Sequence, residues 1–291
     1  MRFPRVLVLG ATGRIGGILR QVWPRLGAQG EILWQTRQDR DKPGWIRVDP
    51  LQEPEELARA AEGQEVILCL SGVVAPRATQ EADPAAALEQ NSTLAEAAIR
   101  AAAGTGARVI LTSSAAVYGG GSGPMTEKAV PAPATPYGMS KLEMERRGVR
   151  LAAELGVPVT SLRIGNIAGV DAILGGWQPG FRLDRFPDGR TPRRSYIGLV
   201  TLARVLAELT TVPGLPPVLN IATPGTVEMG ALLDAAGLDW TPRAPDDTAL
   251  AEVCLSVDRL ERLVTLPDGA GWPDRMVEEW RSLAPDTETE R

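Results

Sequence analysis

Short apolar runs alternate with segments of helical periodicity along the first half of the chain. The run RVLVLGA at 5–11 is almost continuously apolar, as expected of a strand buried on both faces. Apolar residues then recur at helical spacing between Ile15 and Val22. The same criteria predict strands at 31–37, 45–49, 65–70, 107–114 and 158–164, and helices at 54–63, 84–103 and from Tyr137. This alternation predicts a doubly wound α/β fold, a parallel sheet with helices on both faces.

The pattern changes after about residue 165. Glycine, proline, arginine and aspartate gather between 169 and 194, and helical patterns return at 197–209, 227–236 and 273–283. We therefore expect residues 1–168 to form the main domain. Residues 169–291 are expected to form a small, partly helical substrate-binding region, interleaved with the last strand or strands of the main domain. Its expected place is the carboxyl ends of the strands, where open α/β sheets bind ligands.

Composition and charge narrow the classes of partner. The 291 residues are 44% hydrophobic, which is ordinary for a soluble protein with a core. The net charge is −5 and no long run of Lys or Arg occurs, which argues against nucleic acid or an anionic membrane as the main partner. No apolar stretch approaches the roughly 20 residues needed to cross a bilayer. Cys69 and Cys254 cannot form a disulfide framework, so we expect a cytoplasmic protein with Cys69 as a buried structural thiol.

The chain contains no histidine. This excludes Ser-His-Asp and Cys-His catalysis and imidazole metal sites. With only two cysteines, far apart in the sequence, we expect no metal site. Acid–base chemistry must therefore come from Tyr, Lys, Asp, Glu or Cys.

A glycine-rich turn follows the first predicted strand and opens the first helix. Its spacing is GxxGxxG rather than the commoner GxGxxG. Glycine permits a tight turn and close backbone approach to a pyrophosphate, whose charge meets the helix N-terminus. We therefore predict a Rossmann-type fold that binds a dinucleotide, with the following contacts in the turn: Gly10, Thr12, Gly13, Arg14, Ile15 and Gly16.

The end of the second predicted strand bears on the choice of dinucleotide. An acidic residue there would bind a ribose 2′-OH, whereas an arginine would accept a 2′-phosphate. Arg37, supported by Arg14 from the glycine turn, favours NADP over NAD. In the alternative interpretation these arginines are solvated and Asp39 binds the ribose of NAD.

Tyr137 and Lys141 stand four residues apart and therefore share one face of the predicted helix. A tyrosine with a pKa of about 10 is a poor base at neutral pH, but a neighbouring ammonium and an oxidised nicotinamide both favour the phenolate. Ser113 and Ser114 end the preceding strand, at the sheet edge where ligands bind. The pair alone is weak evidence, because such spacing arises by chance on many helices.

The segments GATGRIG, TSSAAVYG and YGMSK, in this order, resemble the extended short-chain dehydrogenase/reductase family, the epimerase and dehydratase relatives. The resemblance covers roughly the first 165 residues. It implies Tyr137 as catalytic acid/base and Lys141 as its pKa-lowering partner and a ribose ligand. It also implies Ser114 as the catalytic hydroxyl residue, with Ser113 as the second choice. A homodimer formed by the two long helices is a further family expectation.

The resemblance also implies contacts outside these three segments. Asp49 matches an acid near the adenine, and Asn91 an asparagine of the helix behind the active site. Asp49 as a turn residue and Asn91 as an exposed helix residue are the alternatives. Asn166 lies in an LRxxN-like segment near the substrate, and Arg194 matches an arginine that grips a substrate diphosphate. The remaining implied cofactor contacts are Leu70, Ser71, Gly72 and Ile164.

Two departures from the family pattern bear on the reaction. Ala115 and Ala116 replace the Asp-Glu pair of the sugar-nucleotide dehydratases, which argues against a dehydratase of that type. In the segment 193–200 the family's Asp, His and acidic positions are also replaced, although several arginines nearby could meet a diphosphate or simply be solvated. The second region is short, which leaves room for a ligand smaller than a UDP-sugar.

These observations predict an NAD(P)-dependent oxidoreductase or epimerase acting on a secondary alcohol or ketone, a sugar or nucleotide sugar. Ser114, Tyr137, Asn166 and Arg194 are the expected substrate ligands. The alternative is a non-catalytic NAD(P)-binding regulator or assembly factor on the same fold, which would not need the Tyr–Lys pair.

Overall fold

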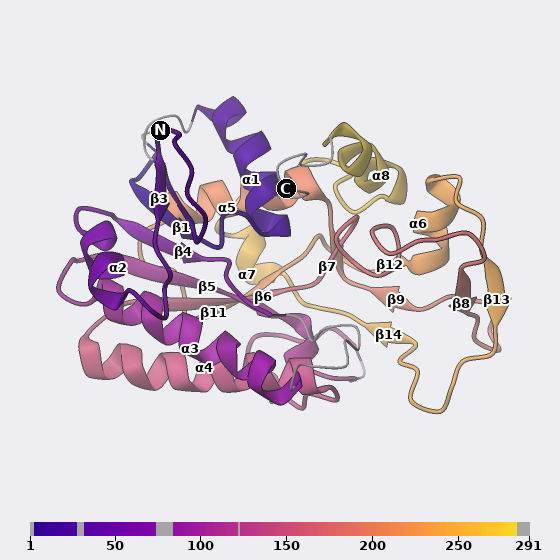
Figure 1. Ribbon diagram of the computed structural model, residues 1–291. Coiled ribbons are helices and arrows are strands. Elements are labelled where there is room, and N and C mark those ends of the chain that lie inside the picture. The colour runs from indigo at the N-terminus through magenta and orange to yellow at the C-terminus, as the bar shows by residue number, and fades with distance from the viewer. Residues whose placement is uncertain (1–2, 28–31, 74–83, 122, 284–291) are drawn as a thin grey trace.

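The computed structural model of the chain describes residues 3–27, 32–73, 84–121 and 123–283. Within these ranges, seven parallel strands form one sheet at the centre of the larger part of the molecule (Figure 1). In spatial order they are β11 (Val218–Ile221), β6 (Val159–Ile164), β5 (Arg108–Ser114), β4 (Val66–Cys69), β1 (Val6–Leu9), β2 (Ile32–Thr36) and β3 (Trp45–Arg47). Every residue of β1 and β4 is buried, which explains why their sequences show no polar alternation.

Helices cover both faces of this sheet (Figure 1). One face carries α1 (Arg14–Val22), the 3-10 turn η1 (Trp23–Leu26) and α5 (Leu199–Thr211); the other carries α2 (Pro54–Ala61), α3 (Pro84–Ala102) and α4 (Pro136–Leu155). Each face has its own apolar core, with Trp23 and Leu202 in the first and Leu57 and Ile99 in the second. The predicted doubly wound, Rossmann-type fold is therefore confirmed.

Strand β1 lies between β4 and β2. The chain first builds the sheet outward from β1 to β3 and then returns to build it outward from β4 to β11 on the other side. The helix that follows β1 and the helix that follows β4 cover opposite faces of the sheet. A crevice therefore opens between the carboxyl ends of these two neighbouring strands. The glycine-rich turn follows β1 directly and so lies at this crevice.

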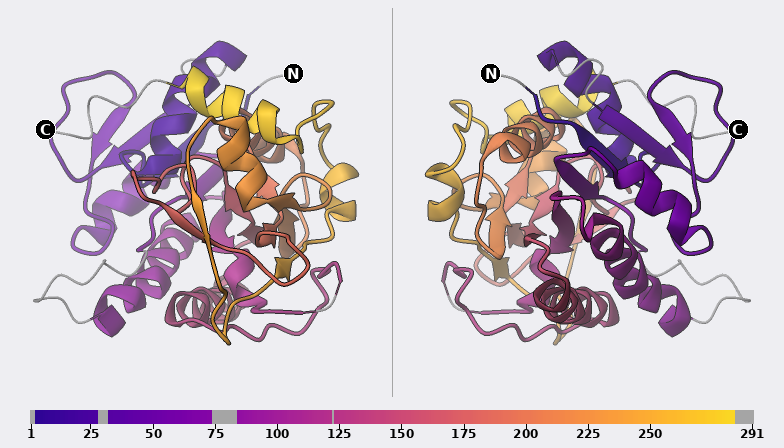
Figure 2. Two further views of the ribbon diagram at one scale, coloured as in Figure 1. Left: turned by 90° about the vertical axis from the view of Figure 1, so that its right-hand side faces the viewer. Right: turned by 90° about the vertical axis from the view of Figure 1, so that its left-hand side faces the viewer.

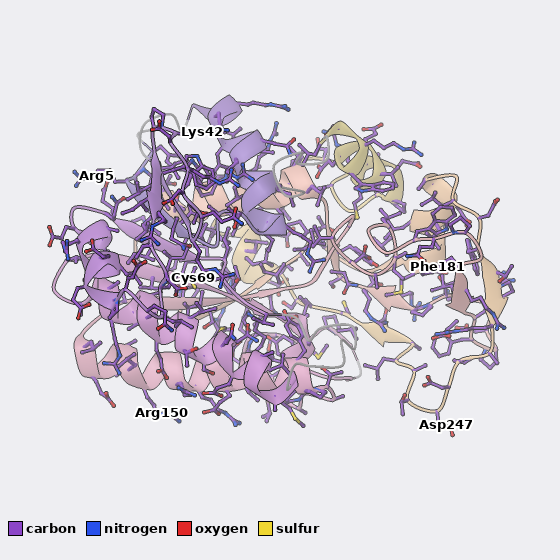
Figure 3. The ribbon with its side chains drawn as sticks, viewed as in Figure 1. Arg5, Lys42, Cys69, Arg150, Phe181 and Asp247 are labelled. Atoms are coloured by element: carbon purple, nitrogen blue, oxygen red, sulfur yellow. The ribbon has the colours of Figure 1, made fainter. Side chains whose placement is uncertain are left out.

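A second, smaller body forms beyond the carboxyl edge of the sheet (Figures 1 and 2). In Figure 3 its residues Phe181 and Asp247 lie far from Cys69, which is buried at the centre of the main body. Its apolar core includes Leu183, Tyr196, Leu232 and Met276. Its elements are β7 (Asn166–Ile167), β8 (Arg182–Asp184), β9 (Arg193–Arg194), β10 (Tyr196–Ile197), β12 (Val227–Glu228), α6 (Met229–Ala235), β13 (Thr241–Arg243), β14 (Glu252–Val253) and α8 (Pro273–Ser282).

Sequence periodicity missed β11 and the short strands of the smaller body. The apolar pattern of β11 is interrupted by Asn220, which is fully buried and whose Nδ2 donates to the carbonyls of Met125 at 2.9 Å and Ser256 at 3.0 Å. Strands of two or three residues contain too few positions to show any alternation. The element α7 (Asp258–Glu261), which packs against β11, is equally short.

Residues 284–291, the end of the expected second region, lie outside the described ranges. Among the helices that the structure describes, none combines the length and the apolar character that crossing a membrane requires.

Candidate active site

Two adjoining cavities follow the carboxyl edge of the sheet. The first, of about 340 Å³, is lined by Gly16, Ser114, Tyr137, Lys141 and Asn166, among others. The second, of about 400 Å³, is lined by Thr12, Arg37, Asp49 and Ser71, among others. Gly10, Gly13, Leu70, Gly72 and Val73 line both cavities. The two cavities therefore form one elongated groove around the glycine-rich turn.

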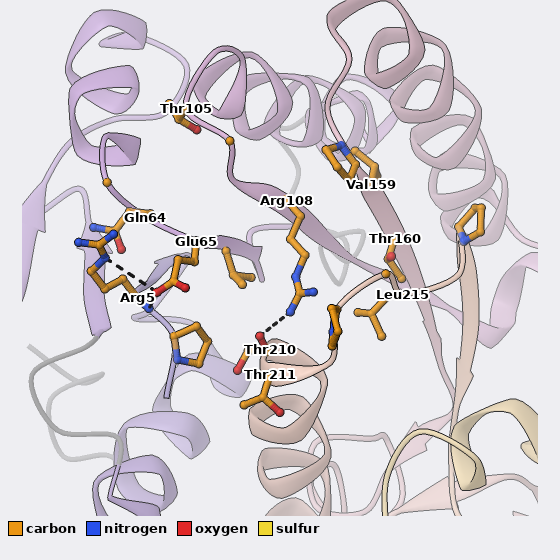
Figure 4. Close-up of a pocket in the computed structure, with 18 residues that line it drawn as sticks. Arg5, Gln64, Glu65, Thr105, Arg108, Val159, Thr160, Thr210, Thr211 and Leu215 are labelled. Atoms are coloured by element: carbon orange, nitrogen blue, oxygen red, sulfur yellow. Dashed lines mark hydrogen bonds and ion pairs between the residues drawn. The ribbon is translucent and has the colours of Figure 1, made fainter. Parts of the chain in front are cut away.

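A larger cavity lies elsewhere in the described part of the chain. It measures about 920 Å³ and is bounded by the amino ends of the strands, for example at Arg5, Glu65 and Arg108 (Figure 4). The Arg108 guanidinium donates to the carbonyls of Leu209, Thr210 and Val212, which end α5. This arginine therefore caps a helix, and the cavity is at the opposite edge of the sheet from the groove. Size alone does not identify the site.

The glycine-rich turn is shaped for backbone approach. Gly10 has a φ of +77°, and a Cβ there would lie 2.8 Å from the Ser71 nitrogen. The Gly10 N–H donates to Gln35 Oε1 at 2.8 Å, which holds the turn against β2. Helix α1 begins at Arg14, and no side chain caps its N-terminus. Its first N–H groups are therefore available to an anion such as a pyrophosphate.

The second cavity holds the residues that bear on the choice of dinucleotide. Arg37 lines it, and among the described residues Arg37 takes part in no ion pair. Asp39, the alternative ribose ligand, is 95% exposed and pairs with Arg47 at 3.3 Å instead. Asp49 lines the cavity, while its Oδ1 also accepts the N–H of Leu51 at 2.9 Å. Asp49 thus stabilises a turn as well as bordering the groove.

The structure places Arg14 away from Arg37. Arg14 lines the first cavity, and its Nη1 donates to the Val170 carbonyl at 2.6 Å. Burial raises the pKa of Tyr137, and the charge of Arg14 partly opposes this shift. Arg14 is therefore engaged in the first cavity and is not among the residues that line the cavity of Arg37.

Asn91 is fully buried, so the alternative of an exposed helix residue is wrong. Its Oδ1 accepts the Val73 N–H at 2.9 Å, and its Nδ2 donates to the Val73 carbonyl at 3.0 Å and to Ser140 Oγ at 3.1 Å. Asn91 lines neither cavity of the groove. It lies behind the groove and fixes the backbone that follows β4 against α4.

Tyr137, Lys141 and Ser114 meet in the first cavity. Helix α4 begins at Pro136, and Thr135 caps it by accepting the Gly138 N–H at 3.1 Å. The Tyr137 hydroxyl hydrogen-bonds Ser114. The Lys141 Nζ lies 6.0 Å from the centre of the Tyr137 ring.

Burial shifts the pKa of both titrating groups. It raises the pKa of Tyr137, against the hydrogen bond from Ser114 and the charge of Arg14. It lowers the pKa of Lys141 from 10.5 to about 8, since the residue is only 4% exposed. One hydrogen bond compensates this burial, because the Lys141 Nζ donates to the Thr112 carbonyl at 3.0 Å. Burial thus favours the protonated phenol of Tyr137 and the neutral amine of Lys141.

A third cavity, of about 210 Å³, opens on the other side of Ser114. It shares Ile164, Gly165 and Asn166 with the first cavity and also includes Arg194. The Arg194 guanidinium donates to its neighbour's carbonyl at 2.7 Å and to that of Leu250 at 2.9 Å. Arg194 is the only positively charged residue among the described residues that line this cavity. The structure does not bring the other expected arginines to this cavity: Arg182, Arg185 and Arg190 are exposed, and Arg193 pairs with Glu252.

Several residues that shape the groove were missed from sequence. Gln35 and Thr112 are polar residues within predicted strands, and such positions are a signal that sequence inspection could have used. Asp171 also lines the first cavity, where it accepts the Tyr196 hydroxyl at 2.7 Å. Burial raises the pKa of the Asp171 carboxyl. Tyr196 lies 25 residues further along the chain, so only the fold reveals this pair.

Comparison with known proteins agrees with this geometry. A sequence model described as the NAD dependent epimerase/dehydratase family matches residues 6–176, more than half of the chain. The chain belongs to this family. It is therefore an enzyme of the short-chain dehydrogenase/reductase kind that depends on a nicotinamide cofactor, and the regulator alternative is not supported.

Solved structures share the fold of this epimerase/dehydratase family member. A UDP-N-acetylglucosamine 4-epimerase of Methanobrevibacter ruminantium, in complex with UDP-N-acetylmuramic acid, superposes with a TM-score of 0.74 at 16% identity, covering 98% of this chain and 100% of that one. The UDP-glucose 4-epimerase of Thermus thermophilus, in complex with NAD, gives 0.71 at 20% identity, with 96% and 100% covered. TunA, an NAD-dependent NDP-hexosamine 5,6-dehydratase of tunicamycin biosynthesis, gives 0.73 at 20% identity, with 96% and 98% covered.

No curated protein sequence matched the chain. At these identities the solved structures establish the fold, and the reaction has to be inferred from the groove.

Proposed function

We propose that this enzyme oxidises or epimerises a secondary alcohol of a sugar or nucleotide sugar, with Ser114, Tyr137 and Lys141 as the catalytic residues. The observation that carries the proposal is the first cavity, where these three side chains lie beside the glycine-rich turn. Epimerases and dehydratases of nucleotide sugars are among the proteins that share the fold.

The shape of the groove fits a nicotinamide dinucleotide. It runs from Arg37 and Asp49, past the open N-terminus of α1, to Tyr137 and Lys141. A Cβ at Gly72 would lie 2.9 Å from both Asn91 Oδ1 and Lys141 Nζ, so only glycine leaves this part of the wall open. When bound, the nicotinamide would supply a hydride acceptor and a positive charge beside Tyr137.

The proton is handled by the chain's own residues. Tyr137, once ionised, takes the proton of the substrate hydroxyl, and in the reverse direction it returns the proton. Ser114, already hydrogen-bonded to Tyr137, holds the same substrate oxygen. Lys141 is held by the Thr112 carbonyl with its Nζ 6.0 Å from the centre of the Tyr137 ring, and in this proposal its positive charge would favour the phenolate. Ala115 and Ala116 border the substrate side, so no carboxylate follows Ser114 to eliminate water.

Substitution of Tyr137 by Phe tests the reaction. The change removes only the hydroxyl and is expected to lower turnover by roughly 10²- to 10⁴-fold, the usual contribution of a general acid/base. The measurement is nicotinamide absorbance or product formation over a panel of nucleotide sugars and free sugars. Tyr118→Phe makes the same change outside the groove, at a hydroxyl that donates to Asn220, and should retain turnover. Unchanged turnover in Tyr137→Phe would refute the catalytic assignment.

The cofactor retained on purification separates the two versions of the reaction. An epimerase returns the hydride to the same substrate and keeps its dinucleotide, whereas a dehydrogenase exchanges it. A native mass spectrum of the purified protein gives the identity and occupancy of the dinucleotide.

For the cofactor we propose a preference for NADP over NAD. Arg37, which has no ion-pair partner within the described part of the chain, supports it, because a 2′-phosphate would form charge-assisted hydrogen bonds with this guanidinium. Arg37→Ala is expected to weaken NADP binding by roughly 10- to 100-fold and to leave NAD binding nearly unchanged. Cofactor titration in parallel with Arg25→Ala, an exposed arginine outside the groove, gives the comparison. An NADP preference that survives in Arg37→Ala would show that another group selects the dinucleotide.

We also propose a homodimer formed by the outer faces of α3 and α4. The two helices pack together, Arg147 of α4 pairs with Glu96 of α3 at 2.6 Å, and Val149 on α4 is half exposed. Sedimentation of Val149→Glu against wild type is the measurement, and equal masses would count against this interface.

A further inference from the structure

Glu145 is a buried carboxylate on α4, one turn beyond Lys141 and two turns beyond Tyr137. Spacing by four residues puts the three side chains on one stripe of the helix. Glu145 is 5% exposed and lines none of the three cavities of the site. The proposed reaction gives it no proton to carry, so its position next to the catalytic pair needs another explanation.

Two neighbouring strands donate hydrogen bonds to this carboxylate. The Ser113 Oγ lies 2.5 Å from Oε1, and Arg163 donates from Nε at 3.0 Å and from Nη2 at 2.6 Å. Ser113 of β5 and Arg163 of β6 are register partners in the sheet. Glu145 therefore ties both strands to α4 at one point.

The pair Ser113 and Arg163, which Glu145 binds, lies one residue before the strand positions that border the first cavity. The next register pair is Ser114 and Ile164, both of which line the first cavity. A displacement of Ser113 would carry Ser114 with it, because the two are adjacent in one strand. Positioning errors well below 1 Å already matter for a hydrogen bond to a reacting oxygen.

Glu145 also acts on Lys141 through its charge. The ammonium is surrounded by Cys69 from β4, the Thr112 carbonyl from β5, and Met144 and Glu145 from α4. Burial lowers the pKa of Lys141, while the charges of Cys69 and Glu145 raise it. The pKa of the Cys69 thiol is itself raised by burial to about 11, so this thiol is neutral at physiological pH. Glu145 is then the carboxylate that supports the ammonium.

Stability alone does not account for the Glu145–Arg163 pair. A buried ion pair is often no more stabilising than apolar side chains of the same volume. Arg163 stacks over the Tyr118 ring at 4.8 Å, yet its buried Nη1 has no hydrogen-bond partner among the described residues. Removing Glu145 alone would leave the buried Arg163 charge without its carboxylate partner, which is costly, so the pair has to be tested together as well as singly.

We propose that Glu145 is a positioning residue of this active site, which fixes the end of β5 against α4 and keeps the Lys141 ammonium charged while Tyr137 exchanges its proton. The inference rests on the proposed function for its catalytic meaning. The effect of Glu145 on the Lys141 ammonium can be measured without turnover.

The chain has only three lysines, Lys42, Lys128 and Lys141, which makes a direct titration practical. NMR of protein labelled at lysine would follow the side-chain signals against pH, with Lys141→Met assigning the signal. In wild type Lys141 should titrate near pH 8. In Glu145→Gln the midpoint should fall by about one pH unit, because a nearby negative charge is lost. Glu143→Gln, at a half-exposed carboxylate of the same helix, should leave the midpoint unchanged.

The pH profile of turnover gives the second readout. In Glu145→Gln the loss of activity on the alkaline side should move to lower pH by the same amount as the Lys141 midpoint. Ser113→Ala removes only the hydrogen bond, so it should lower kcat without moving the midpoint. If Glu145→Gln does not fold, Glu145→Met combined with Arg163→Met removes the pair and should still lower the midpoint.

A Lys141 midpoint that is unchanged in the folded variant would overturn the inference. So would an alkaline limb of the pH profile that superimposes on that of wild type. The proposed function fails on a different result, namely full turnover in Tyr137→Phe, and the NMR titration is independent of it.

Discussion

At the level of single residues, the proposed reaction depends on Tyr137 and Lys141, and burial shifts the pKa of each in the direction unfavourable to catalysis. Tyr137 must ionise, and burial raises its pKa; Lys141 must stay charged, and burial lowers its pKa to about 8. The surroundings oppose both shifts, through Ser114 and Arg14 for Tyr137 and through Glu145 for Lys141. The positive charge of a bound nicotinamide would lower the pKa of Tyr137 toward the working pH. It would also lower the pKa of Lys141, so the proposed reaction relies on Glu145 to keep the ammonium charged.

Burying the Lys141 ammonium has a stability cost that pH should reveal. Its pKa is about 8 in the folded chain against an ordinary 10.5, a difference worth about 3 kcal/mol. Because the folded-state pKa is the lower one, the cost is fully present below pH 8 and disappears as pH rises toward 10.5. Lys141→Met should therefore be inactive yet melt several degrees higher than wild type at pH 7.

The melting difference between Lys141→Met and wild type should shrink as pH rises from about 8 to about 10, as calorimetry or scanning fluorimetry would show. Lys128→Met, at an exposed position, should show no such pH dependence. A difference that stays constant with pH would mean that the ammonium is not destabilised by burial.

At the level of elements, the walls of the groove are formed by the carboxyl ends of the strands and by the turns that follow them. The turn from β1 to α1 places Gly10 against Ser71, just after the end of β4. The segments that leave β1 and β4 are therefore in close contact at Gly10. Strand β5 contributes through three successive residues: the Thr112 carbonyl holds Lys141, Ser113 donates to Glu145, and Ser114 hydrogen-bonds Tyr137. The end of β5 thus contacts α4 along two helical turns, from Tyr137 to Glu145.

Gly10 is required both for its positive φ and for its close contact with Ser71, and a comparison with Gly63 separates these two requirements. Both have a positive φ, +77° and +72°, but nothing lies within 4 Å of a Cβ at Gly63, whereas Ser71 lies 2.8 Å from a Cβ at Gly10. Gly63→Ala should cost about 1 kcal/mol through φ alone. Gly10→Ala should cost clearly more and should also weaken dinucleotide binding at least tenfold. Urea unfolding and cofactor titration measure the two effects, and equal costs would show that the Ser71 contact relaxes freely.

At the level of the whole molecule, the chain after residue 168 is divided between two places. It builds the smaller body, which adds Arg194 to the site, and it also returns α5 and β11 to the main sheet. Trp23 on the first half donates to the Ala203 carbonyl of α5 at 2.8 Å, and β11 pairs with β6 along its length. The two expected regions are thus interleaved in space.

A fragment of residues 1–168 should consequently not fold as a stable unit. It would lack the helix that covers Trp23 and the strand that borders β6, so it would expose a large apolar surface and a free sheet edge. We expect poor solubility and weak protection in hydrogen exchange compared with the full chain. A fragment that is soluble, monomeric and protected like the full chain would show that the first half is independent.

Much of the main sheet could be predicted from sequence, because the signals of its strands and helices lie in residues close together along the chain. The strands from β1 to β6 are apolar runs buried on both faces, and helices α1 to α4 carry their apolar residues at helical spacing. That Ser114, Tyr137 and Lys141 line one cavity could be anticipated, because a strand end and a helix start are visible in sequence; their catalytic roles were implied by the family resemblance and stay a prediction. The hydrogen-bond partners of Asn91, Arg14 and Glu145 could not be predicted, since the positions of Val73, Val170 and Arg163 relative to them depend on how the elements pack.

The sequence by itself determined the fold class, the glycine-rich turn and the Tyr–Lys spacing, because each depends on residues close together along the chain. Tertiary structure alone decided which polar groups became partners: Glu145 with Ser113 and Arg163, and Asp171 with Tyr196. It also decided that Arg37 and not Arg14 borders the second cavity. Such pairings are non-local, and a buried polar side chain is stable only where the completed fold supplies its partner.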